Sequence, residues 1–170
     1  MKVVSTPVIG VLRTPHTDQQ GMPIQPSGAA CCKGQAIIQP ELAAGLKDLD
    51  GFSHVILLYH FHQSKGFDLT LTPFLDTAEH GLFATRSPRR PSGIGLSVVR
   101  VLSVSDNVVE LEGVDMLDNS PLLDIKPYVP RFDTPEGEIR CGWLDTTADN
   151  AEQAKSDDRF IRRDQEQAED

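Results

Sequence analysis

The sequence predicts a mainly β protein, either a barrel or a sandwich, with one short helix and a helical or frayed C-terminal tail. Roughly seven to eight short runs of apolar and β-branched residues lie between clusters of turn-forming residues, as is typical of strands. Only one segment has the start and stop signals of a helix. The length of 170 residues suits a single domain followed by a tail.

The first strand is expected over residues 3–12, with an irregularity at Pro7 because proline has no N–H to donate to a neighbouring strand. A polar loop follows over residues 14–34. It is rich in glycine and proline and has no periodicity, and loops of this length in compact domains are commonly functional or disordered. A short strand is expected over residues 34–39.

Residues 40–49 predict the helix. Pro40 suits its first turn, and Glu41 lies near the positive end of the helix dipole. The apolar face consists of Leu42, Leu46 and Leu49, and Asp50-Gly51 ends the helix.

Residues 52–62 form the most apolar stretch of the chain, and its continuity predicts a central strand covered on both faces. The remaining strands are expected over 67–74, 81–85, 94–104, 108–114 and 122–125, followed by a proline-rich extended segment over 126–131.

Acidic residues outnumber basic ones, and the formal net charge is −9. Residues 149–170 alternate small and charged residues without an apolar stripe. We therefore predict one β domain over residues 1–148 and a charged C-terminal tail over 149–170. The domain itself is acidic, so DNA binding is not expected, and any nucleic acid would have to meet a local basic patch.

No run approaches the roughly 20 apolar residues of a membrane-spanning helix, and the N-terminus lacks the pattern of a secretory signal. Cys31, Cys32 and Cys141 form no C-x-x-C pair. This argues against a disulfide framework or a structural zinc site and indicates a reducing cytoplasm. The glycine-rich motifs of the common dinucleotide and nucleotide folds are missing from the sequence, so a nucleotide-like cofactor would have to be bound by loops at strand ends.

A candidate binding segment lies between the strands expected over 81–85 and 94–104. Arg86, Arg89 and Arg90 are set around Pro88 and Pro91, which stiffen the loop and exclude a helix. Guanidinium groups held in this way suit carboxylates, phosphates or base edges. The alternative is a solvated basic loop with no ligand.

A second candidate segment covers residues 114–128. It places Asp115, Asp118 and Asp124 near Lys126 and Tyr128, around a turn at residues 119–121. Three carboxylates, a lysine and a phenol exceed what a turn requires, although a plain solvated turn explains Asp118 and its neighbours as well.

Two further motifs have weaker local signals. Gln25, Pro26 and Ser27 lie in the long polar loop, where a mobile loop is the alternative. His60 and His62 would share one face of a strand and could ligate a metal. No third ligand lies at motif spacing, so buried, hydrogen-bonded histidines are expected and a metal is not.

The two candidate segments together, FATRSPRRPSGIGLSVV and GVDMLDNSPLLDIKPYVP, closely resemble the TsaA-like (TrmO) family. The resemblance extends to the opening IGVLRTP and to the strand that ends in FHQ, and it spans about residues 3–131. It implies a small β-barrel that works as a homodimer. It also implies an S-adenosylmethionine-dependent methyltransferase that acts on N6 of the threonylcarbamoyl-modified adenosine beside the tRNA anticodon.

Carried over position by position, the resemblance implies which residues hold the cofactor. These are Gln25, Pro26, Ser27, Gln63, Ser64, Arg86, Leu96, Asp115, Met116, Leu117 and Asp118. Arg89, Arg90 and Lys126 are expected to bind the substrate. An exocyclic amine loses a proton as it is methylated, so a proton acceptor is needed. Asp118 or Asp124 is expected to take that proton, with Tyr128 orienting it.

Two departures from the family pattern motivate alternatives. Ser92-Gly93 replaces an asparagine and a proline after Arg90-Pro91, and an acidic tail is found where longer members have a further domain. The alternatives are a methyltransferase acting on another RNA or a small molecule, and a non-catalytic module that binds S-adenosylmethionine.

Overall fold

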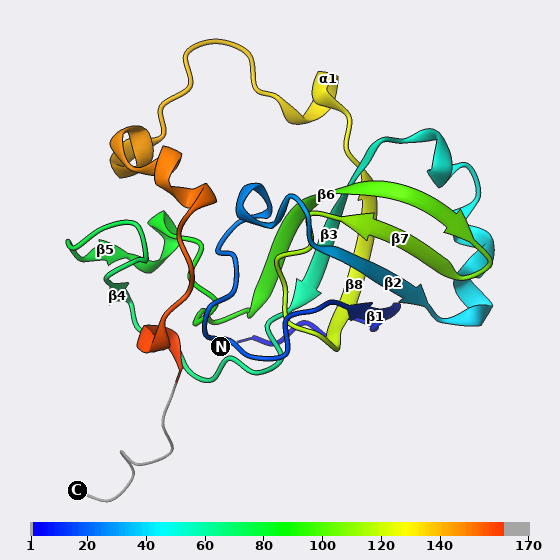
Figure 1. Ribbon diagram of the computed structural model, residues 1–170. Helices are drawn as coiled ribbons and strands as arrows, with labels where there is room; N and C mark the ends of the chain where they lie inside the picture. The colour runs from blue at the N-terminus through cyan, green and yellow to red at the C-terminus, as the bar shows by residue number, and fades with distance from the viewer. Residues whose placement is uncertain (1, 162–170) are drawn as a thin grey trace, which may run out of the picture.

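Six antiparallel strands close into a barrel in a computed structural model that describes residues 2–161 (Figure 1). Around the barrel the order is β1-β2-β7-β6-β3-β8, and β8 pairs with β1 to close it. The strands are β1 (Gly10–Arg13), β2 (Lys33–Ile38), β3 (His54–His60), β6 (Ile94–Ser105), β7 (Val108–Glu112) and β8 (Ser120–Pro127). The predicted mainly β fold with a small barrel is confirmed.

The core of the barrel is made by alternate residues of each strand. In β3, Val55, Leu57 and Tyr59 point inward and are almost fully buried. Leu12, Leu111 and Leu122 meet them from other strands, and each buried aliphatic side chain contributes about 1.5–3 kcal/mol. The other face of β3 is only half-buried, so this strand is not covered on both faces as its apolar sequence had suggested.

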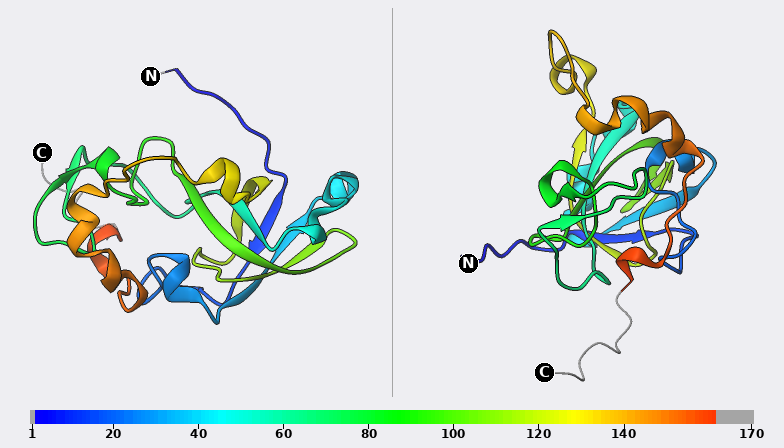
Figure 2. Two further views of the ribbon diagram at one scale, coloured as in Figure 1. Left: turned by 90° about the horizontal axis from the view of Figure 1, so that it is seen from above. Right: turned by 90° about the vertical axis from the view of Figure 1, so that its left-hand side faces the viewer.

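The first strand is shorter than expected and begins at Gly10 rather than residue 3. Val3 and Val4 are exposed, and the chain runs away from the barrel before Gly10 (Figure 2). The strand expected over residues 81–85 does not continue beyond Gly81, which ends the short strand β5 (His80–Gly81). The chain then forms the short 3-10 helix η4 (Leu82–Ala84), because the Thr85 N–H and hydroxyl both close back onto the Leu82 carbonyl.

The expected helix forms as two 3-10 pieces, η2 (Pro40–Leu46) and η3 (Leu49–Gly51). Asp48 lies between them with φ of 66°, a left-handed conformation that a continuous helix does not accommodate. The strand expected over 67–74 is reduced to β4 (Thr70–Leu71), which pairs with β5 (His80–Gly81) in a separate small sheet.

Two further short elements are η1 (Pro26–Ala29) and α1 (Pro130–Asp133). α1 takes the place of part of the extended segment expected over 126–131. None of the helices in the described part of the chain has the length and apolarity that crossing a membrane requires.

After α1 the chain arches away and then returns across one end of the barrel (Figures 1 and 2). The returning segment, here called the C-terminal strap (residues 142–161), contains η5 (Gly142–Thr146), η6 (Ala148–Glu152) and η7 (Asp158–Phe160). Residues 149–161 of the predicted tail therefore pack on the domain. Residues 162–170 lie outside the described part of the chain.

Candidate functional site

A cavity of about 590 Å³ lies at one mouth of the barrel. Its walls come from five parts of the chain: the barrel strands β3 and β6, the long loop before β2, the segment from Pro73 to Arg90, the turn between β7 and β8, and the C-terminal strap. The volume is in the range of pockets that hold cofactors and other small molecules.

The floor of the cavity contains a chain of polar groups on the barrel wall. Tyr59 of β3 and Ser97 of β6 are both buried, and their hydroxyl oxygens lie 3.2 Å apart. Ser97 Oγ donates a hydrogen bond of 2.6 Å to Oδ1 of Asp115, which lies in the turn between β7 and β8. The three polar groups thus form one connected line.

Burial is the main cause of the pKa shifts of Asp115 and Tyr59. It raises the pKa of Asp115 from 3.8 to about 6, partly offset by the Ser97 hydrogen bond and by the positive charge of Arg86. Burial, with the nearby Asp115 charge, also raises the pKa of the Tyr59 phenol far above its ordinary value. At neutral pH the phenol is therefore a donor and Asp115 is largely an ionised acceptor.

The loop over residues 86–91, here called the arginine loop, contains three arginines whose guanidinium groups make different contacts. Arg86 lines the cavity and donates to the Gln25 amide oxygen at 2.9 Å, linking two segments predicted to hold a cofactor. Arg90 also lines the cavity but donates to the Thr85 and Ser87 carbonyls, which fixes the loop. Arg89 faces a neighbouring depression, where it forms an ion pair with Asp68 at 3.0 Å.

Most of the residues predicted to contact a cofactor are brought together at this cavity. Those lining it are Gln25, Gln63, Ser64, Arg86, Leu96, Asp115, Met116 and Leu117. Pro26 and Ser27 begin η1 and are not among the lining residues. Ser64 donates to the Pro88 carbonyl at 3.0 Å, so it also ties the end of β3 to the arginine loop.

The predicted proton acceptors lie elsewhere. Asp118 does not line the cavity; its carboxylate accepts from the Thr14 N–H and pairs with Arg13 at 3.2 Å, which fastens the turn to β1. Asp124 pairs with Lys126 at 2.6 Å on the outside of β8. Neither of these two residues lines the cavity, and nor does Tyr128.

Sequence reasoning missed several lining residues, among them Trp143 and Phe160, and it considered His62 only as a possible metal ligand. His62 lies just beyond the end of β3, and burial together with His60 lowers its pKa. Trp143 and Phe160 belong to the strap, which has no apolar stripe because its contacts come from isolated side chains on short turns. The one signal available was that Trp143 is the single tryptophan of the chain.

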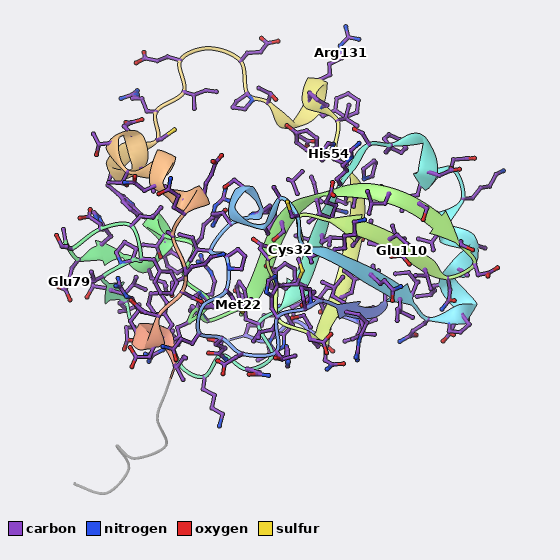
Figure 3. The ribbon with its side chains drawn as sticks, in the orientation of Figure 1. Met22, Cys32, His54, Glu79, Glu110 and Arg131 are labelled. Atoms are coloured by element: carbon purple, nitrogen blue, oxygen red, sulfur yellow. The ribbon has the colours of Figure 1, made fainter. Side chains whose placement is uncertain are left out.

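The strap is held at both ends and closes one side of the cavity. At its start the Trp143 indole donates to the Ala84 carbonyl at 2.9 Å and stacks on the His80 ring at 4.6 Å. At its end Ser156 exchanges hydrogen bonds with Met22, and Phe160 packs edge-on against Phe74. Figure 3 shows Met22 on the strap side of the molecule and Glu110 on the far side of the barrel.

We expect Trp143→Ala to loosen the start of the strap by about 1–2 kcal/mol, because it loses one hydrogen bond and one aromatic stack. Amide hydrogen exchange should then be faster by about tenfold over residues 142–152 and unchanged in β3. Trp143→Phe, which keeps a ring but not the indole donor, should have a smaller effect. Exchange in the strap that is identical to wild type in both variants would show that these contacts do not hold it.

The cavity combines an acid, a guanidinium and apolar surface within one volume. Asp115 and Arg86 could hold a ligand that carries both positive and negative groups, and Leu96, Leu117 and Trp143 offer apolar faces for a planar ring. Within residues 2–161, no group of three or more His, Cys, Asp or Glu side chains is placed to hold a metal ion.

Comparisons with known proteins point to one family. Residues 11–134 match the family model described as tRNA-methyltransferase O N-terminal domain. A probable S-adenosyl-L-methionine-binding protein of Pyrococcus abyssi is 45% identical over 153 residues, which is 90% of this chain and 83% of that protein. The human tRNA (adenine(37)-N6)-methyltransferase is 35% identical over 138 residues.

The crystal structure of TrmO from Pseudomonas aeruginosa superposes with a TM-score of 0.70 and 36% sequence identity, over 85% of this chain. The chain spans 64% of that structure and 31% of the human protein, so it corresponds to part of these longer relatives.

Proposed function

The chain belongs to the tRNA-methyltransferase O N-terminal domain family, and from this membership we propose that it is an S-adenosylmethionine-dependent methyltransferase. Its substrate is N6 of the threonylcarbamoyl-modified adenosine beside the tRNA anticodon. The relatives named as tRNA (adenine(37)-N6)-methyltransferases support N6-methylation of a tRNA adenine.

One observation carries this proposal: three groups suited to the two ends of the cofactor meet in a single cavity although they come from distant parts of the chain. Gln25, Arg86 and Asp115 all line it, and Arg86 is bonded to Gln25. When bound, S-adenosylmethionine supplies a methyl group made electrophilic by its attachment to a sulfonium.

Each group has a defined part in holding that ligand. The Arg86 guanidinium has donors to spare after bonding Gln25, and these suit the carboxylate of the methionine end. The Asp115 carboxylate attracts the positive charge of the sulfonium or the ammonium group. Gln63 and Ser64 extend the polar rim, while Leu96, Met116 and Leu117 form apolar contacts with the adenosine. Methyl transfer needs donor and acceptor in line, so a preformed cavity of this kind contributes mainly by alignment.

For the tRNA we propose a contact surface around the arginine loop. Arg89 lies at the neighbouring depression and Arg90 at the cavity edge, which suits a nucleotide whose base enters the cavity while its phosphates stay outside. Lys126 lies on β8, where Asp124 neutralises it, so its contribution to this surface is the smallest of the three.

We further propose that the protein acts as a homodimer in the cytoplasm. Phe83 is exposed next to the cavity and Ile94 is exposed where it lines the cavity, and a second copy would cover such apolar side chains. A tRNA substrate is consistent with a cytoplasmic location.

Arg86→Ala is expected to weaken S-adenosylmethionine binding at least tenfold, because it removes the charged partner for the ligand carboxylate. Titration calorimetry measures this directly. The matched control is Arg100→Ala, which removes an exposed arginine paired with Glu112 on the barrel wall away from the cavity. Equal affinities for wild type and Arg86→Ala would exclude the proposed site.

A second candidate is a binding module without transferase activity. The share of each relative that the chain spans favours this candidate. The chain spans most of an archaeal relative named only as a binding protein, but about a third of the mammalian methyltransferases. Mass spectrometry of tRNA nucleosides after incubation with protein and cofactor separates the two. Appearance of the N6-methylated nucleoside supports the transferase, and tight cofactor binding without it supports the module.

A further inference from the structure

Asp115 differs from every other carboxylate near the cavity. Among the described residues, the acids that line the cavity are Asp115 and Asp157. Asp157 is neutralised by Arg159, with a closest contact of 2.7 Å, and it caps the start of η7. Asp115 has no arginine or lysine in ion-pair contact within residues 2–161, and Arg86 acts on it only at longer range.

Resting on the proposed methyltransferase function, we propose that Asp115 is the proton acceptor of the reaction, oriented by Ser97 and Tyr59. It takes the role that the sequence had given to Asp118 or Asp124.

The reaction requires such a group. As the N6–CH₃ bond forms, the S–CH₃ bond breaks and its electron pair passes to sulfur, which becomes a neutral thioether. The nitrogen would be left positively charged, so its proton has to leave. In this proposal that proton passes to the Asp115 carboxylate and from there to solvent through the cavity mouth, and the charges balance.

The hydrogen-bond line fixes the orientation of the acceptor. An ionised carboxylate can only accept, so Ser97 must donate to Asp115, and the Ser97 oxygen is then free to accept from the Tyr59 hydroxyl. Donation therefore runs from Tyr59 through Ser97 to Asp115. Both hydroxyls are buried on barrel strands, which hold the carboxylate on rigid elements at the cavity floor.

The acid–base properties suit the task. A pKa of about 6 leaves Asp115 mainly ionised at pH 7 and makes it a stronger base than an ordinary aspartate. Arg86 faces it from the arginine loop and Tyr59 from β3, and Arg90 and His62 also line the cavity. Arg86 opposes the rise in pKa without cancelling it.

The other candidates are less suited. Asp118 is occupied by Arg13 and the Thr14 N–H, and Asp124 by Lys126. His62 lines the cavity and has a lowered pKa, so it is a neutral acceptor at pH 7. Its contact to Ser120 is at the long limit of 3.5 Å, which orients the ring less firmly than Ser97 orients Asp115 at 2.6 Å.

The test compares Asp115→Asn with wild type in single-turnover methylation of tRNA at saturating cofactor, from pH 5 to pH 8. Wild type should lose activity below about pH 6. The variant keeps an oxygen for Ser97 but has no basic form, so its rate should fall at least 100-fold and no longer vary over this range. Cofactor affinity, measured by calorimetry, should fall as well, because Asp115 also attracts the positive charge of the cofactor, and saturating cofactor separates that loss from the loss of rate.

A second readout does not depend on turnover. Carbon-13 NMR of the aspartate carboxyls in the free protein should contain one signal that titrates near pH 6 and is missing from Asp115→Asn. Ser97→Ala should shift this titration and reduce kcat about tenfold with KM unchanged, as expected of a positioning residue. Glu110→Gln, on β7 and hydrogen-bonded to Gln35, is the matched carboxylate-to-amide control and should match wild type.

The outcomes are distinct. An Asp115→Asn variant that keeps the wild-type rate at saturating cofactor overturns the inference, even if its cofactor affinity falls. The inference is also overturned if the fall in methylation rate below pH 6 disappears in His62→Asn rather than in Asp115→Asn. It is overturned as well if the Asp115 carboxyl titrates near pH 4. If wild type methylates no tRNA, the proposed function fails, and the inference with it.

Discussion

Gly95→Ala is expected to destabilise the protein by about 2–3 kcal/mol and to disrupt the cavity floor. Gly95 pairs with Tyr59 across β6 and β3. A methyl group at Gly95 would lie 2.4 and 2.5 Å from two Tyr59 ring carbons and 3.0 Å from Phe61. Tyr59 is 5% exposed and packs edge-on against Phe61, so its ring has no free space into which to move.

Urea denaturation monitored by circular dichroism measures this loss of stability. The matched control is Gly45→Ala in η2, where an added methyl group meets no atom within 4 Å. This control should be neutral or slightly stabilising, because alanine is the better residue in a helical turn. A Gly95→Ala protein as stable as Gly45→Ala would mean that Tyr59 can be displaced at little cost, and the rigid support assigned to Ser97 and Asp115 would be lost with it.

The strands of the barrel were predictable because their signals are local. The alternation in 94–104 and 108–114, with a turn between them, predicts a hairpin, and β6 and β7 form it. Residues 82–85 are mostly apolar as well, but within residues 2–161 no strand pairs with them. Strand formation depends on that partner, and composition alone does not supply it.

The candidate site was predictable as a set of segments but not in its detail. Asp115 and Asp118 are three residues apart in one motif, yet Asp115 faces the cavity while Asp118 turns to Arg13 on β1. Asn119 follows with φ of 63°, and this left-handed residue directs the chain back toward β1. The contact of Asp118 with Thr14 spans 104 positions and that of Asp115 with Ser97 spans 18, so the local sequence cannot specify them. The same holds for Trp143, whose partners Ala84 and His80 belong to a distant segment.

The burial of Asp115 that suits it to catalysis is expected to lower the stability of the folded protein at neutral pH. The pKa of Asp115 rises from 3.8 to about 6 on folding, because burial disfavours its charged form. Between about pH 4 and pH 6 the folded protein therefore holds a proton that the unfolded chain has released. This contribution to stability is complete below pH 4, decreases as the pH rises, and is lost above pH 6.

Asp115→Asn removes the buried charge and should be more stable than wild type by about 2 kcal/mol at pH 7, a figure that allows for the side of the carboxylate facing the cavity. The difference should become small near pH 4, where Asp115 is protonated in the folded protein and partly protonated in the unfolded chain. Urea denaturation at the two pH values tests this, with Glu110→Gln as the matched carboxylate-to-amide control. A variant less stable than wild type at pH 7 would mean that Arg86 and Ser97 outweigh the cost of burial. A variant that is more stable but inactive would indicate that the fold bears this cost in order to hold a base at the cavity floor.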